Sequence, residues 1–378
     1  MRNFLFLLFF SLTFPLFALR SGDRSLPLTG IKWLVGRPLT LTFPAPEAGQ
    51  RVHRAVVFLL THSSNAPETL QILNGLSERY GKRFQVAVIT PDPETDARNF
   101  LNRFPLKGIS FGVDAQRQLT GKYMGGSMLY PMAFVTDYRG EILWNGEVVD
   151  LPELLEEAEK APIDADKQEK LSKMLDELQV MMRDNNNRKM RHLTDRIFRL
   201  DPGNAAALRM RLFVLENSGR IPEAWLTIRS QLAAVPGKAR LYYTAVDLIA
   251  RYPYLSRELP GVIAQFMKNV SDPDACDFLT YTLLNRFPFD TAALSGAIRL
   301  YERSCMLAKT LRRTPAASAG HTGAGALLAS RLGNFPKALE LQRQTIKFWE
   351  QAQNRGAASA AEKIAEYFEL CAKSQVKW

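Results

Sequence analysis

One stretch near the start of the chain, Ala55–Glu68, constrains the fold more than any other. It begins with six apolar residues, Ala55–Leu60, which are typical of a buried β-strand. Small polar residues follow at Thr61–Ala66, and Pro67 then stands where a helix tolerates proline in its first turn. A strand that passes through a short polar turn into a helix is a basic unit of α/β domains, and such turns often carry functional residues.

The neighbouring segments predict that this unit belongs to one α/β domain covering about residues 30–160. Apolar, β-prone runs predict strands at Pro38–Pro44, Ala55–Leu60, Phe84–Thr90, Ile109–Val113, Met132–Thr136 and Glu141–Asn145. Apolar spacing predicts helices at Pro67–Tyr80, Pro93–Phe104, Gln116–Tyr123 and Leu151–Lys160. We expect the preceding residues, Leu19–Thr29, to form an exposed lead-in.

The turn within Ala55–Glu68 resembles the active-site turn of exported thioredoxin-like and redoxin proteins. In that family the segment reads approximately F-W-A-T-W-C-x-x-C-x-x-E. Phe58 and Thr61 hold matching places in this chain, whereas Glu68 falls one residue short of the family's Glu. The resemblance implies a thioredoxin-like fold for the first domain.

A second motif carries the same resemblance. The segment Pro131–Asp137 matches the family pattern G-x-P-x-x-F-x-x-D from its proline onward, with Leu129 in place of the glycine. The resemblance implies that Pro131 is a cis-proline that faces the turn. Such a loop presents extended backbone with which a peptide could pair.

The family's redox chemistry has no sulfur to use at this turn. His62 replaces the tryptophan, Ser63 the first cysteine and Ala66 the second, with Ser64 and Asn65 between them. Thiol–disulfide exchange needs an attacking thiolate and a resolving thiol. We therefore predict that the turn is a degenerate redox site and expect Ser63, Ser64 or Asn65 to cap the following helix. A hydrolase built on His62 and Ser63 is a weaker alternative, because no acid is evident to orient the imidazole.

The second half of the chain has a different pattern. After a short linker at 161–166, amphipathic helical segments fill residues 167–378, and almost no strand signal remains. Helix-stop pairs at Pro202-Gly203 and Pro236-Gly237 are 34 residues apart. That spacing resembles the period of tetratricopeptide repeats. The predicted fold class is α/β plus all-α, a thioredoxin-like domain followed by a tetratricopeptide-like α-solenoid.

Two short motifs support the repeat assignment. Ser218–Ala224 and Leu332–Ala338 each place an alanine five residues after a glycine, as between the two helices of a tetratricopeptide unit. Because the motifs are 114 residues apart, the array is expected to be irregular, with an interruption at Thr310–Gly325. A partner could contact aromatic and basic residues of the array, although helix packing accounts for them equally well: Trp225, Trp349, Tyr242, Tyr243 and Arg240.

The start of the chain predicts export. Residues 1–18 combine Arg2, an apolar run and a small residue at Ala18, which is typical of a signal peptide. An uncleaved anchor is the alternative, although the run is short for a membrane span. We therefore expect a periplasmic or secreted protein. Three cysteines lie in the second half, Cys276, Cys305 and Cys371, and an oxidising compartment would allow one disulfide among them.

Charge and motif patterns exclude several function classes. The net charge is +11, and residues from Ala161 onward contribute 32 basic against 22 acidic side chains. These charges are interleaved, which favours a solvated helical surface over a nucleic-acid site. No cluster has metal-ligand spacing, and no glycine-rich segment has phosphate-loop context, so neither a metal nor a cofactor is expected.

The sequence thus predicts an exported, catalytically inactive thioredoxin-like protein that acts as a scaffold for a protein or peptide partner, with no nucleic-acid ligand and no stable membrane span after signal cleavage. One alternative is an oxidoreductase or peroxiredoxin-like enzyme that borrows Cys276, Cys305 or Cys371. Another is a holdase chaperone for exported chains. Both alternatives stay open on the sequence.

Overall fold

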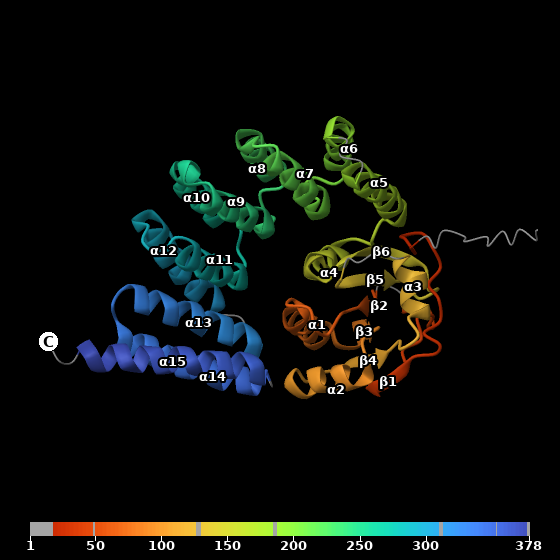
Figure 1. Cartoon of the computed structure of the whole chain (residues 1–378), viewed down its shortest axis with the longest axis horizontal. Coiled ribbons are helices and arrows are strands. Elements are labelled where there is room, and N and C mark those ends of the chain that lie inside the picture. The colour runs from red at the N-terminus through yellow and green to blue at the C-terminus, as the bar shows by residue number, and fades with distance from the viewer. Residues whose placement is uncertain are drawn as a thin grey trace, which may run out of the picture. The chain divides into compact units, whose positions relative to one another are not determined.

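The computed structural model describes residues 18–47, 50–125, 130–183, 187–309, 313–352 and 354–375. The chain divides into two compact units, and Asp166–Trp378 belongs wholly to the second (Figure 1). The first unit is α/β and the second is helical. The signal segment expected at residues 1–18 lies outside the described residues except for Ala18.

A six-stranded mixed sheet forms the centre of the first unit, in the order β1-β4-β3-β2-β5-β6. Strands β2, β3 and β4 are parallel, and β1, β5 and β6 run antiparallel to their neighbours. The strands are β1 (Lys32–Val35), β2 (His53–Phe58), β3 (Phe84–Thr90), β4 (Ile109–Val113), β5 (Met132–Thr136) and β6 (Ile142–Glu147). Five of them lie at or within two residues of their predicted positions.

Four helices accompany the sheet at the predicted places: α1 (Ala66–Tyr80), α2 (Glu94–Arg103), α3 (Gln118–Met124) and α4 (Leu151–Lys160). Helix α3 packs on one face of the sheet, where Tyr123 meets Phe58 and Phe134 with ring centroids 5.1 and 5.0 Å apart. Alternation along β2 assigns Val56 and Phe58 to this face and Ala55 and Val57 to the other. All four β2 side chains are buried, as the continuous apolar run predicted.

The lead-in is not exposed as predicted. Gly22 N donates to Ile142 O at 2.8 Å, and Ile142 N donates to Asp23 O at 2.8 Å. The Tyr123 hydroxyl also donates to Leu26 O at 3.0 Å. The segment packs along β6 and α3 because these backbone groups need partners when they are covered.

The edge strand predicted at Pro38–Pro44 is wrong. That segment is irregular, and β1 takes the edge position by pairing with β4. A proline at each end lacks the N–H that a ladder needs. The Arg54 side chain instead donates to the carbonyls of Thr40 and Thr42, so the segment is satisfied without a strand partner.

Eleven helices are described in the second unit, and successive ones lie side by side (Figure 1). They are α5 (Ala165–Arg183), α6 (Asn187–Leu200), α7 (Ala205–Asn217), α8 (Ile221–Ala234), α9 (Ala239–Arg251), α10 (Leu259–Asn269), α11 (Pro273–Arg286), α12 (Thr291–Ala308), α13 (Pro315–Arg331), α14 (Phe335–Gln351) and α15 (Arg355–Gln375). Helices α7, α9 and α11 begin 34 residues apart, at Ala205, Ala239 and Pro273. The predicted repeat period is therefore present, and it is lost only after α12.

Both predicted inter-helix motifs form the same turn. Gly219 and Gly333 have φ of 69° and 76°, a left-handed conformation that favours glycine at a helix end. The next residue closes each turn, since Arg220 N donates to Leu215 O and Asn334 N to Ala329 O. The alanine of each motif then packs with no exposed surface in the following helix.

The predicted interruption at Thr310–Gly325 is wrong for most of its length. Helix α13 begins at Pro315, capped by the Thr314 hydroxyl, which accepts from Ala317 N at 3.2 Å. Its glycines and alanines allow close packing rather than a loop: a Cβ at Gly325 would lie 2.2 Å from the Tyr301 hydroxyl. Residues 310–312 lie outside the described part of the chain.

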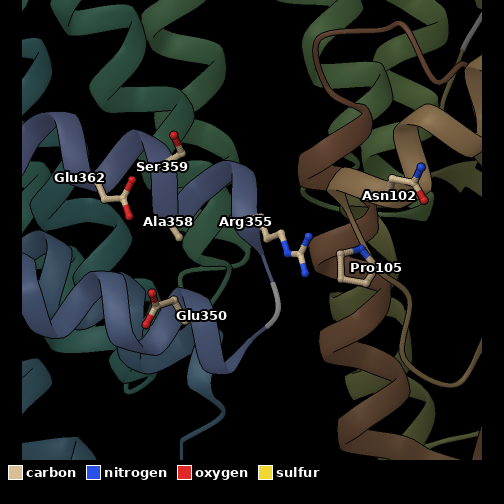
Figure 2. A pocket seen from close by; sticks show the side chains of 7 residues that line it. All are labelled: Asn102, Pro105, Glu350, Arg355, Ala358, Ser359 and Glu362. Carbon is tan, nitrogen blue, oxygen red and sulfur yellow. The ribbon is translucent and has the colours of Figure 1, made fainter.

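The aromatic residues suggested as partner contacts belong to the helical core. Trp225 and Tyr242 are buried, and the Tyr243 hydroxyl donates to Ala275 O at 3.3 Å. The connection from α14 to α15 instead carries exposed polar side chains on both helices; Figure 2 shows Glu350, Arg355, Ser359 and Glu362. Among the described residues, no helix is both long and apolar enough to cross a membrane.

Candidate functional site

The turn that follows β2 meets the turn that follows β3. These strands are parallel neighbours, so their carboxyl ends lie at one edge of the sheet. Thr61 comes after β2 and Asp92 after β3. The backbone N–H and the hydroxyl of Thr61 both donate to Asp92 Oδ2, at 2.6 and 2.7 Å. A buried carboxylate therefore fixes the start of the candidate turn.

His62 has an acidic partner that the sequence analysis did not find. Its Nδ1 atom lies 3.4 Å from Asp92 Oδ2, and its side chain is 73% exposed whereas that of Asp92 is 5% exposed. The expectation that no acid is placed to orient this imidazole is wrong. The parallel pairing of β2 and β3, with Asp92 just after a predicted strand, was the signal that could have revealed the contact.

The Ser63 hydroxyl is held within the turn itself. Its Oγ atom lies 2.9 Å from Leu60 O and 2.7 Å from Asn65 Oδ1, both of which accept from it. A serine nucleophile would need its proton directed at a base such as His62. The observed bonds direct it to two other acceptors, so the arrangement does not support a hydrolase at this turn.

Backbone groups rather than a side chain close the start of α1. Asn65 holds the N-cap position, yet its side chain makes no capping bond. Ala66 N donates to Ser63 O at 3.1 Å, and Thr69 donates to Asn65 O from both its N–H and its hydroxyl. The capping prediction is thus right for the position of Asn65 and wrong for its mechanism. Ser64 is exposed.

Pro131 adjoins the same turn. The Tyr130–Pro131 peptide bond is cis, as predicted. The Asn65 amide donates to Tyr130 O at 3.5 Å, so a side chain of the turn touches the residue before the proline. The structure therefore brings together the turn residues and the proline loop that the sequence placed in one site.

The first unit contains no thiol. The two positions that match the family's cysteines hold Ser63, in contact with Leu60 O, and Ala66, which has no exposed surface. The first cysteine of the chain is Cys276. The turn has the fold context of a redox site and none of its reacting atoms.

The three cysteines of the second unit are free. Burial raises the pKa of the Cys276 thiol to about 11. Burial, helped by the negative charge of Asp277, also raises the pKa of the Cys305 thiol. A higher pKa reduces the fraction of thiolate, the form that attacks disulfides and peroxides. These two thiols are therefore poorly suited to act unaided in the borrowed-cysteine alternative.

No group of three or more potential metal ligands gathers in the part of the chain that the structure describes. The described residues also include no glycine-rich turn that joins a strand to a helix in phosphate-loop fashion. The candidate site therefore consists of a carboxylate, an imidazole, small hydroxyl and amide groups and the backbone beside Pro131. Such groups can bind a polar or extended ligand.

Comparisons with known proteins agree with this architecture. No family model and no curated protein matches the chain. Two similar solved structures cover 37% of it at 20% identity: a protein described as thiol:disulfide interchange protein DsbE from Chlorobium tepidum (99% of that chain, TM-score 0.30) and one described as a thioredoxin from Neisseria meningitidis (89%, TM-score 0.28). A tetratricopeptide repeat protein from Parabacteroides merdae covers 54% of this chain and 96% of its own at 12% identity, with a TM-score of 0.22.

The strand order and the cis-proline before β5 give the first unit a thioredoxin-like fold. The helix pairs with a 34-residue spacing and glycine turns give the second unit a tetratricopeptide-like fold. The chain is a thioredoxin-like α/β unit followed by a tetratricopeptide-like α-solenoid.

Proposed function

We propose that this protein is an exported binding scaffold whose thioredoxin-like unit has lost thiol chemistry. The observation that carries the proposal is the replacement of both sulfur positions by Ser63 and Ala66 in a turn that keeps its fold context. Without a thiol in the first unit, disulfide exchange at this turn has no nucleophile. Recognition of a ligand needs none.

The thioredoxin-like unit would bind an extended peptide beside Pro131. Backbone pairing gives affinity in such complexes, and nearby side chains select the sequence. The exposed His62 and Asn65 stand at the turn next to Tyr130 and could make those contacts. Asp92 would fix the direction of the imidazole without taking part in any reaction.

The helical unit would hold a second protein segment. Tetratricopeptide-like arrays commonly present surfaces for peptides and proteins. Exposed aromatic side chains at Phe278, Tyr281 and Phe289 support this role, since aromatic residues are enriched at protein interfaces. Residues 1–18 support export, which would bring the scaffold to envelope or secreted partners.

Site-specific cross-linking tests the proposal. A photo-reactive amino acid at position 62 should capture a protein partner in cells. The same amino acid at Arg139, an exposed position in the β5–β6 turn, is the matched control and should capture much less. The purified protein should also fail to reduce insulin disulfides. Insulin reduction that depends on the protein's cysteines, or equal capture at both positions, would contradict the scaffold role.

A further inference from the structure

A second polar cluster lies inside the helical unit, where Asp277 of α11, Cys305 of α12 and His321 of α13 meet. His321 Nδ1 lies 3.0 and 3.1 Å from the two oxygens of Asp277. On the other side of the ring, Nε2 lies 3.7 Å from Cys305 Sγ. The sequence gave no sign of this, because the three residues come from separate helices and the histidine stands alone in the chain.

The chemistry of the partners fixes the tautomer of His321. An ionised carboxylate only accepts hydrogen bonds, so Nδ1 carries the proton and donates to Asp277. Nε2 then presents its lone pair to the Cys305 thiol. This is the order of groups that activates a nucleophile: an acid orients an imidazole, and the imidazole accepts the proton of the attacking atom.

Several contacts hold the cluster in place. Arg313 donates to Asp277 Oδ2 at 2.9 Å and to Ser304 Oγ at 3.0 Å, and the Asp277 side chain is 6% exposed. The Tyr301 ring stacks on the imidazole with centroids 4.8 Å apart and planes 13° apart. The imidazole cannot rotate freely between these neighbours, so its two nitrogens stay directed at the carboxylate and the sulfur.

The thiol is accessible enough to meet a small reagent. Cys305 is half-buried, and the His321 side chain is 21% exposed. Titratable and charged groups that face the pair come from each element packed around it in the described residues: Asp274 and Asp277 on α11, Tyr301 and Glu302 on α12, and Arg313 before α13.

We propose that Cys305 is a reactive thiol that His321 activates as a general base, and that it forms a mixed disulfide with small organic disulfides. Nε2 of His321 accepts the thiol proton as the Cys305 sulfur attacks one sulfur of the disulfide. The S–S bond of the reagent breaks, and the departing thiolate takes the proton from the imidazolium. One disulfide is consumed and one is formed, so no further oxidant or reductant is needed.

This site differs from a borrowed thiol for the thioredoxin-like turn. All its groups belong to the helical unit, and its action requires no contact with Ser63 or Pro131. A raised pKa makes the unaided Cys305 thiol slow at neutral pH. The adjacent base removes that limit, because the proton leaves during the attack instead of before it.

The test is the reaction of the full chain with 4,4′-dithiodipyridine, followed by absorbance, with mass analysis of the peptide that contains Cys305. We expect His321→Gln to lower the Cys305 rate at pH 7 by about 10²-fold, the usual size of general-base assistance. His192→Gln, at an exposed position of α6, is the matched control and should leave the rate unchanged. Equal rates for the wild type and His321→Gln would overturn the proposal.

A pH profile of the wild-type protein gives a reading that does not depend on a variant's folding. With an imidazole as proton acceptor, the Cys305 rate should level off below about pH 8. A thiol that reacts only through its own ionisation would instead keep gaining rate above about pH 9, since burial raises its pKa. The second behaviour, or labelling confined to Cys276 and Cys371, would overturn the proposal.

Discussion

The Nδ1 atom of His62 lies 3.4 Å from Oδ2 of Asp92, the oxygen that also accepts both hydrogen bonds from Thr61. One carboxylate oxygen thus holds the end of β2 and adjoins the imidazole that follows. The contact exists because β2 and β3 run parallel and deliver their following residues to the same edge. The degenerate turn is therefore an ordered structure, and its loss of sulfur is a chemical change within a retained geometry.

Removal of this carboxylate should destabilise the first unit. We expect Asp92→Ala to lower the free energy of unfolding by about 1–3 kcal/mol, because the buried N–H of Thr61 loses its acceptor. Asp96→Ala, at an exposed position of α2, is the control and should change stability by at most about 0.5 kcal/mol. Urea unfolding of both variants measures the difference, and similar losses would contradict the role of Asp92.

Two cysteines should restore disulfide exchange to the turn. Ala66 N donates to Ser63 O at 3.1 Å, a turn that keeps the two Cα atoms within about 7 Å, close enough for a disulfide. Sulfurs at a helix N-terminus also have lowered pKa values. The double variant Ser63→Cys/Ala66→Cys should therefore reduce insulin faster than the wild type. Ser63→Cys alone is the control, and a double variant no faster than it would refute the expectation.

His53 should make stability depend on pH. Burial, followed by the charge of Arg51, lowers the pKa of this imidazole, and neither ring nitrogen has a hydrogen-bond partner among the described residues. The unfolded chain therefore binds the proton more readily than the folded one. The contribution is fully present above the unfolded pKa of about 6.5 and is lost as the pH falls toward the lower folded value.

The measurement compares unfolding free energies of the wild type and His53→Leu at pH 7.5 and pH 5. We expect the fall in stability on acidification to be smaller in the variant. His192→Gln serves as the control at an exposed position and should keep the wild-type fall. An unchanged fall in His53→Leu would show that other groups carry the dependence.

The glycine at the α7–α8 turn should resist substitution for a purely conformational reason. Gly219 has φ of 69°, and a Cβ there would meet no atom within 4 Å. Gly219→Ala should therefore cost about 1–2 kcal/mol, the penalty of the left-handed conformation alone. Gly261→Ala on α10 also has open space and an ordinary helical backbone, so it should stabilise by about 0.5–1 kcal/mol. Thermal unfolding distinguishes the two, and equal signs would contradict the argument.

The regular elements were predictable where one physical signal dominated. The apolar run of β2, the polar turn after it and the helix with proline near its start depend on local residue types, and they lie where they were expected. The glycine turns at Gly219 and Gly333 were equally clear, since only a left-handed position explains a glycine between two amphipathic helices. The segment at Pro38–Pro44 misled because its alternation imitates a strand while its prolines prevent the ladder.

The helix at Pro315–Arg331 misled in the opposite sense. Its glycines and alanines suggest a loop by propensity, yet they allow α13 to approach Tyr301 closely, and packing outweighs propensity there. Close approach between helices leaves no trace in the residues of either one alone. The same limit hid the cluster of Asp277, Cys305 and His321.

The sequence by itself determined the order of the elements, the position of the functional turn and the absence of sulfur from it, because each follows from residue types at neighbouring positions. Only the tertiary structure decided which groups meet. Asp92 reaches His62 through parallel strand pairing, and His321 reaches Cys305 through the packing of three helices. These contacts join residues far apart in the chain, and their distances depend on how strands pair and helices pack rather than on local preference.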